Sequence, residues 1–384
     1  MTDQKSFHPR LLHLHVWAEL GQLIRKNAVL CIAFAAAAVT SCIIPPDAQY
    51  LDYFDLKTLT CLFCVLAVVC ALKNIKFFTI LARKIVDCTG NLRMASLALV
   101  YITFIGSMLI ANDMALLTFL PLGYFVLSST GKNRYMAFVF IMQNIAANLG
   151  GMLTPFGNPQ NLYLYTKFNI PTGEFMTIML IPFLAAIALI TLCCLFLPRE
   201  ALSISEECPH KLPAKRTALY LALFVLSIVI VFRVIPYWIG LIVIPLVLFF
   251  TDRQALCRVD YPLLLTFVCF FVFAGNMARI PMISQLFSGL LEKNTLIVSA
   301  LSCQLISNVP SAILLSQFTE NYPALLLGVN IGGTGTLISS LASLITFREY
   351  TSHNPDKAGK YLFLFSLFNF AFLGILLFIS SFLV

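Results

Sequence analysis

Long apolar runs recur along the whole chain, and they constrain its fold more than any other feature of the sequence. The runs at 94–127, 175–197 and 361–384 each exceed the roughly 18–20 residues that a helix needs to span a bilayer. Lipid offers the backbone no hydrogen-bond partner, so these runs must be helical. Only 11% of the residues are charged, against about 25% in a soluble domain. The sequence therefore predicts an all-α polytopic membrane protein.

The net charge of +8 does not indicate a nucleic-acid partner, because Lys and Arg lie at the ends of the predicted spans. This distribution is the topology signal of membrane proteins, whose cytoplasmic loops collect positive charge. A trace from span to span places the N-terminus in the cytoplasm and the C-terminus outside. The cationic residues that it leaves outside are Lys57, Lys167, Arg233, Arg279 and Lys293. We expect an integral protein of a bacterial-type plasma (inner) membrane.

The same trace divides the chain into two halves of similar length. A cytoplasmic segment at 1–27 precedes the first half at 28–197, and a polar cytoplasmic linker at 198–217 leads to the second half at 218–384. Segment 1–27 carries charge throughout and lacks a small-residue cleavage site, so a signal peptide is not expected. It forms either an interfacial amphipathic helix or a polar lead-in to the first span.

Two short patterns recur in the same order in the two halves. IANDMALL at 110–117 matches ISNVPSAILL at 306–315, and NLGGMLT at 148–154 matches NIGGTGT at 330–336. By the charge trace, the first apolar hairpin opens from the cytoplasm and the second from outside. The halves are therefore predicted to run in opposite directions, which is the inverted-repeat signature of secondary transporters.

The tip of each hairpin carries an asparagine, Asn112 or Asn308. A turn inside hydrocarbon survives only where its unpaired N–H and C=O groups face protein or water. Asparagine tolerates unusual backbone angles and offers both an acceptor and two donors. The limbs of the second hairpin are too short to span, which predicts re-entry, and the first hairpin follows by symmetry. The alternative is that these amides only join helices to one another.

The glycine pairs in the second pattern predict two broken helices. Paired glycines let the backbone unwind, so that carbonyl oxygens can approach a cation. The half-helix after each break would direct its positive end at an anion. Glycine and serine at such spacings also permit close helix packing, which is the competing interpretation.

Asp113 is the lone acidic residue between Asp87 and Glu174. An aspartate in the middle of a membrane costs about 2.5–3.5 kcal/mol on insertion scales, and a proton or Na⁺ would neutralise it. That exchange is what a coupling site requires. The alternative is a helix-capping aspartate at the hairpin tip.

These motifs, with TPFGNPQN at 154–161, resemble the ion transporter superfamily, in particular its citrate transporter and arsenite permease-like branch. The divalent anion/sodium symporters are its relatives. The resemblance implies an elevator-type transporter, usually a homodimer, with Na⁺ held at the tips and breaks and the substrate between the tips. The dicarboxylate symporters carry Ser-Asn-Thr at both tips, whereas this chain has Ala-Asn-Asp and Ser-Asn-Val. That departure argues against a dicarboxylate and favours proton coupling through Asp113.

Two sets of site residues follow from the motifs and the resemblance. The predicted substrate contacts are Asn112, Asp113, Thr154, Asn158, Asn308, Ser311, Thr334 and Thr336. The predicted cation ligands, with Na⁺ as a candidate metal, are Asn112, Asp113, Asn148, Gly150, Gly151, Ser307, Asn308, Asn330, Gly332 and Gly333.

The predicted function is a secondary active transporter that moves a small anion, either a carboxylate or an inorganic oxyanion, with Na⁺ or H⁺ as coupling ion. The alternative is a Na⁺/H⁺ antiporter or an arsenite efflux permease of the same fold. No HExxH, GxSxG or phosphate-loop pattern occurs, so neither an enzyme nor a further cofactor is expected. Cys61-x-x-Cys64 lacks a second ligand pair and is interpreted as small buried hydrophobes.

Overall fold

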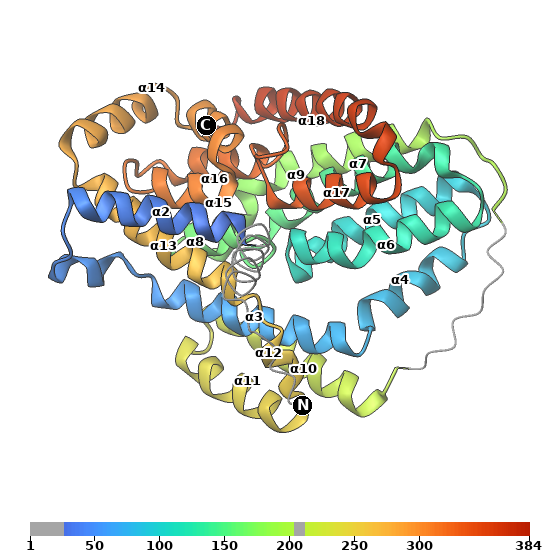
Figure 1. Ribbon diagram of the computed structural model, residues 1–384, viewed down its shortest axis with the longest axis horizontal. Helices are drawn as coiled ribbons and strands as arrows, with labels where there is room; N and C mark the ends of the chain where they lie inside the picture. The colour runs from blue at the N-terminus through green and yellow to red at the C-terminus, as the bar shows by residue number, and fades with distance from the viewer. Residues whose placement is uncertain (1–26, 203–211) are drawn as a thin grey trace, which may run out of the picture.

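The computed structural model describes residues 27–202 and 212–384, and its regular structure in those ranges is helical apart from one isolated bridge between Asn91 and Ala201 (Figure 1). Seven of the described helices are long and apolar enough to cross a membrane. The prediction of an all-α polytopic membrane protein is confirmed. The segment predicted at 1–27, except its last residue, and the middle of the linker lie outside the described residues.

The helices of the first half fall on the predicted spans. They are α2 (Ala28–Ile43), η1 (Ala48–Tyr53), α3 (Leu56–Asn74), α4 (Phe77–Asp87), α5 (Leu92–Ile110), α6 (Asn112–Ser129), η2 (Asn133–Tyr135), α7 (Met136–Gly150), η3 (Gly151–Leu153), α8 (Pro159–Lys167) and α9 (Thr172–Leu195). Polar caps define several starts, since Asp55 accepts a hydrogen bond from Thr58 N and Asn91 accepts one from Met94 N.

The second half follows the same scheme. Its helices are α10 (Ala214–Val231), α11 (Tyr237–Thr251), α12 (Arg253–Cys257), α13 (Tyr261–Ala278), α14 (Pro281–Ile306), α15 (Asn308–Leu315), α16 (Tyr322–Ile331), α17 (Leu341–His353), η4 (Pro355–Lys357) and α18 (Ala358–Ser380). The first part of α14 was not predicted from the sequence. It ends at Asn294, which has non-helical angles and caps the second part by accepting from Ile297 N.

The helices divide into two groups by their contacts. The hairpin group consists of α5 to α9 and α15 to α18, with the part of α14 after Asn294. The flanking group consists of α2, α3 and α10 to α13, in which α2 packs on α13 and α3 packs on α10 and α11. The two groups meet where α3 contacts α8 and where α13 contacts α15.

Within the hairpin group, equivalent elements of the two halves make equivalent contacts. Helix α5 packs on α7 as α14 packs on α16. Across the halves, α6 packs on α17, and α15 packs on α8. The second limb of each hairpin therefore lies against the half-helix that follows the break in the other half, so neither half can form this group alone (Figure 1).

The two hairpins open at opposite ends of α9. At the start of the first hairpin, Arg93 Nε donates to Leu197 O, just beyond the end of α9, at 2.7 Å. After the second hairpin, Tyr322 donates to Glu174 in the first turn of α9 at 2.5 Å. A helix of 24 residues is about 36 Å long, so the two openings lie a membrane thickness apart.

Two glycines allow the close packing of the equivalent helix pairs. A side-chain carbon on Gly150 would lie 2.3 Å from Phe104 O, and one on Gly332 would lie 2.9 Å from Ala300 Cα. Each of these partners precedes the tip asparagine of its hairpin by the same number of residues. The same contact therefore forms once in each half.

We expect Gly150→Ala and Gly332→Ala to lower the Tm of the detergent-solubilised protein, because overpacking costs about 1–3 kcal/mol. The matched control is Gly374→Ala in α18, where no atom lies within 4 Å of the added carbon. Alanine is preferred to glycine in a helix by up to about 1 kcal/mol, so the control should keep or raise the Tm. Thermal unfolding of the three variants tests this. Equal Tm values for all three would contradict the packing argument.

A cluster around Glu200 attaches the start of the linker to the opening of the first hairpin. Its carboxylate accepts from Lys132 at 2.5 Å and from Tyr135 at 2.8 Å, and it forms an ion pair with Arg134. The backbone adds a bond from Leu92 N to Glu200 O at 2.8 Å. The hydrogen bonds from Lys132 and Tyr135, with the charge of Arg134, lower the pKa of Glu200 from 4.5 to about 2.

We expect Glu200→Gln to lower the Tm at pH 7. Because the pKa is lower in the folded than in the unfolded state, this stabilisation is complete above pH 4.5 and is lost as the pH falls through about 2. The difference in Tm from the wild type should therefore stay constant from pH 7 to about 4.5 and shrink below it, as scanning fluorimetry can measure. Glu292→Gln, on an exposed position of α14, is the control. A difference that grows on acidification would refute the assignment.

Candidate functional site

Each hairpin turns at a residue whose backbone lies in a region normally reserved for glycine. Ala111 has φ 66° and ψ 155°, and Ser307 has φ 74° and ψ 161°. Such a conformation costs about 1–3 kcal/mol in a residue with a side chain, and it concentrates at functional sites. The two residues directly precede Asn112 and Asn308, so the strain occurs once at each predicted tip.

The two tip asparagines adopt the same local arrangement. Asn112 Oδ1 accepts from Asp113 N at 3.0 Å, and Asn308 Oδ1 accepts from Val309 N at 2.9 Å. Each side-chain oxygen thereby accepts from the next backbone N–H of the second limb and leaves the NH₂ group for other partners. Asn112 Nδ2 donates to Asn148 Oδ1 at 3.3 Å.

The two tips and the second break meet at Gly333. A side-chain carbon placed there would lie 3.2 Å from Asn308 Nδ2, 3.2 Å from Asn330 O and 3.7 Å from Asn148 Oδ1. With the bond from Asn112 to Asn148, both tips and both predicted break asparagines lie at one point. We call Asn112, Asn148, Asn308 and Asn330 the asparagine cluster; none of its members is more than 4% exposed.

The α-helix is interrupted at both predicted breaks, although one 3₁₀ turn, η3, follows α7 directly. Helix α7 ends at Gly150 and α8 begins at Pro159, whereas α16 ends at Ile331 and α17 begins at Leu341. The residues at equivalent positions before the new helices, Asn158 and Ser340, both have extended backbone. The two breaks thus end in the same way.

At each break, one side-chain amide donates hydrogen bonds to carbonyl groups that the interrupted helix leaves unpaired. Asn161 Nδ2 donates to Gly151 O at 3.1 Å and to Thr154 O at 3.3 Å. Gln304 Nε2 donates to Gly332 O at 2.8 Å and to Thr334 O at 3.1 Å. An unpaired buried carbonyl costs about 1–3 kcal/mol, so these two amides hold the unwound segments in place.

The breaks of the two halves are also bonded to each other. Asn330 Nδ2 donates to Asn161 Oδ1 at 2.6 Å, and Asn158 Nδ2 donates to Asn330 Oδ1 at 3.4 Å. Asn330 belongs to the second half, and Asn158 and Asn161 belong to the first. A movement of one break must therefore be transmitted to the other.

The hydroxyl groups predicted to contact substrate are engaged in hydrogen bonds within the protein. Thr154 Oγ1 donates to Met108 O at 3.1 Å, Thr334 Oγ1 to Ile331 O at 2.6 Å, and Thr336 Oγ1 to Gln304 O at 3.2 Å. Ser311 and Ser302 share a bond of 2.9 Å across the second hairpin. Their role as substrate contacts stays a prediction.

Among the described residues, the side chain of Asp113 makes no hydrogen bond to the asparagine cluster. It lines a cavity of about 80 Å³ at the junction with α3 and α13, and apart from Asp260 its lining is otherwise apolar. Its Oδ1 is inaccessible and accepts no hydrogen bond from a described residue. The cavity therefore brings two acidic side chains into one apolar space, where a bound cation would balance their charge.

Sequence reasoning missed several residues of this site. Asp260 lies in a loop far from Asp113 in the chain, and no local pattern marks it. Gln304 could have been singled out as an isolated amide in an apolar helix. The same signal marks Asn144 and Asn369, whose side chains bond at 3.4 Å beside the asparagine cluster. Within the described residues no group of three His, Cys, Asp or Glu could hold a metal.

Comparisons with known proteins agree with this architecture. A family model described as citrate transporter matches residues 14–324. An uncharacterized transporter of Methanocaldococcus jannaschii is 33% identical over 80% of this chain and 84% of its own length. The inner membrane protein YbiR of Escherichia coli is 28% identical over 71% of this chain and 74% of its own length.

We expect Gln304→Glu to destabilise the protein, because the carboxylate loses the donor group that satisfies Gly332 O and Thr334 O. The loss should be about 1–3 kcal/mol for each buried acceptor left unpaired. Gln254→Glu, at an exposed position of α12, is the matched control and should leave the Tm unchanged. Chemical or thermal unfolding measures both. A Tm for Gln304→Glu equal to that of the control would show that the break does not depend on this amide.

Proposed function

The chain belongs to the citrate transporter family, and we propose that it is a secondary active transporter that moves a small anion with Na⁺ or H⁺ as coupling ion. The observation that carries the proposal is the meeting of two strained tips and two helix breaks at Gly333. Unwound backbone near the centre of a membrane is the feature from which secondary transporters build their sites.

The proposal includes an inverted repeat and elevator-type movement. Supporting observations are the hairpin openings at opposite ends of α9 and the equivalent packing of Gly150 and Gly332. The hairpin group would move as one body, because its halves are bonded through Asn330. The flanking group would form the scaffold, and a homodimer would hold it still against the moving body.

Free acceptor oxygens support a cation at the first break. A side-chain carbon on Gly151 would lie 2.5 Å from Asn158 Oδ1 and 2.8 Å from Gly157 O, so both oxygens lie against this glycine. Asn158 Oδ1 is buried and accepts no hydrogen bond from a described residue. Backbone and amide oxygens in an unwound segment are typical Na⁺ ligands of transporters.

The anion would lie between the tips, where amide NH₂ groups and the positive ends of α8 and α17 are its partners. A second candidate, a Na⁺/H⁺ antiporter or an arsenite efflux permease, is favoured by a different observation. Asp113 and Asp260 share the apolar cavity, and a transported cation or proton could bind there without an anion.

The direct test is uptake by proteoliposomes of citrate, sulfate and arsenite, with and without Na⁺, at two pH values. We expect citrate or sulfate to be concentrated against its gradient when a Na⁺ or proton gradient is imposed. Transport of arsenite alone, or of Na⁺ against H⁺ with no anion moved, would establish the second candidate. Equilibration without concentration would indicate a channel and refute both.

We expect Asp113→Asn to abolish the pH dependence of transport, because the amide cannot exchange a proton or bind a cation by charge. Asp356→Asn, on the exposed η4, is the matched control and should behave as the wild type. Initial uptake rates at a series of pH values measure the effect. Unchanged pH dependence in Asp113→Asn would remove this residue from the coupling mechanism.

A further inference from the structure

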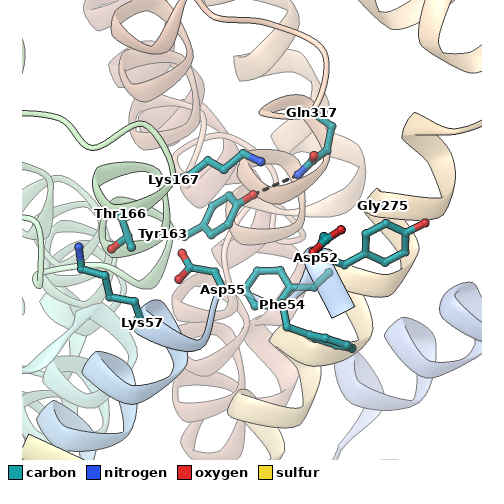
Figure 2. A pocket seen from close by; sticks show the side chains of 11 residues that line it. Asp52, Phe54, Asp55, Lys57, Tyr163, Thr166, Lys167, Gly275 and Gln317 are labelled. Atoms are coloured by element: carbon teal, nitrogen blue, oxygen red, sulfur yellow. Dashed lines mark hydrogen bonds between the residues drawn. The ribbon is translucent and has the colours of Figure 1, made fainter. Parts of the chain in front are cut away.

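A second, larger cavity lies at the boundary between the hairpin group and the flanking group. Its volume is about 360 Å³, and α3 and α13 line it on one side while α8 and the end of the second hairpin line it on the other (Figure 2). The charge trace predicts that this end of the molecule lies on the external side of the membrane. We call this cavity the external vestibule. Its charged and polar lining includes Asp52, Asp55, Lys57, Thr166, Lys167 and Gln317.

Two lysines give the vestibule groups that can bind an anion. Lys57 and Lys167 are two of the few cationic residues that the charge distribution of the sequence places on the external side of the membrane. Neither forms an ion pair with a described residue. Arg233 acts electrostatically on Lys57 from nearby. The guanidinium of Arg233 donates to Asn169 Oδ1 at 2.7 Å rather than to a carboxylate. Two lysines thus line one cavity, with Arg233 close to one of them, and none of the three forms an ion pair with a described residue.

The two carboxylates of the vestibule are placed differently from the lysines. Asp55 caps α3, where Oδ1 accepts from Thr58 N at 2.9 Å and Oδ2 accepts from Thr58 Oγ1 at 2.5 Å. Asp52 is exposed and lies on η1, outside the helices that enclose the cavity. One acidic group is therefore committed to a helix end, and the other repels an approaching anion from the rim.

Three polar side chains of the wall, those of Tyr163, Thr166 and Gln317, come from the hairpin group. Gln317 Nε2 donates to Tyr163 Oη at 3.2 Å, which joins the end of the second hairpin to α8. Thr166 adds a hydroxyl that has no bond to another described side chain, and Lys167 extends from the same helix (Figure 2). A ligand bound here would contact both groups, so its binding would respond to their relative position.

We propose that the external vestibule binds a small carboxylate through Lys57 and Lys167 before the solute reaches the asparagine cluster. The role in transport rests on the proposed function, whereas binding itself does not. Charges lining a cavity raise the local concentration of a counter-ion, which lowers the solute concentration needed for capture.

Binding can be tested without transport by acetylating the purified full chain with an anionic, water-soluble amine reagent and quantifying each lysine by mass spectrometry. Citrate is the probe. We expect citrate to protect Lys57 and Lys167 but not the exposed Lys293, and chloride at equal ionic strength to protect none of them. Equal protection of Lys293, or protection by chloride, would reduce the effect to charge screening and overturn the proposal.

Transport gives the second readout. Lys57→Gln and Lys167→Gln should each raise the KM for uptake from outside by roughly three- to tenfold with little change in kcat, since they weaken capture only. Asp52→Asn should lower the KM, and Lys293→Gln should leave it unchanged. If citrate protects the two lysines from acetylation but is not taken up, the binding site is supported and the proposed substrate class is rejected. Uptake with an unchanged KM in both lysine variants would reject the vestibule.

Discussion

The need to pair every backbone polar group inside lipid is the constraint on which the rest of this structure depends. Helices meet it over most of the chain, but the two breaks leave carbonyl groups that helices cannot pair. Asn161, in the half-helix that follows the first break, and Gln304, in the first limb of the second hairpin, supply the missing donors. These amides fix the unwound carbonyl groups, whereas Asn158 Oδ1 in the first break accepts no hydrogen bond from a described residue.

A second consequence is that the two halves cannot act separately. Asn330 bonds to both Asn158 and Asn161, and each hairpin packs its second limb on a half-helix from the other half. The strained turns at Ala111 and Ser307 persist only because this packing over-determines them. The same contacts that stabilise the strain also join the two halves of the hairpin group to each other.

Charge is distributed around this unit in an ordered way. The centre holds neutral amides, which can bind an anion or a cation without the cost of a permanently buried charge. Carboxylates at Asp113 and Asp260 lie at one boundary with the flanking group, and ammonium groups at Lys57 and Lys167 lie at another. Both cavities are lined by α3 and α13, so a shift of the hairpin group against those helices would change both together.

The amino-acid sequence alone determined the helices, the hairpin tips and the breaks, because each of these depends on local chain chemistry. The signals were the apolar runs, the recurring asparagine and glycine patterns and the positions of Lys and Arg. The sequence did not predict the first part of α14, because this polar, amphipathic segment carries no signal of a membrane span. Tertiary structure alone decided that Asp113 and Asp260 line one cavity, and that Gln304 serves the second break. Those pairings join residues distant in the chain, and the rotation of a helix about its axis, which sets them, is decided by packing.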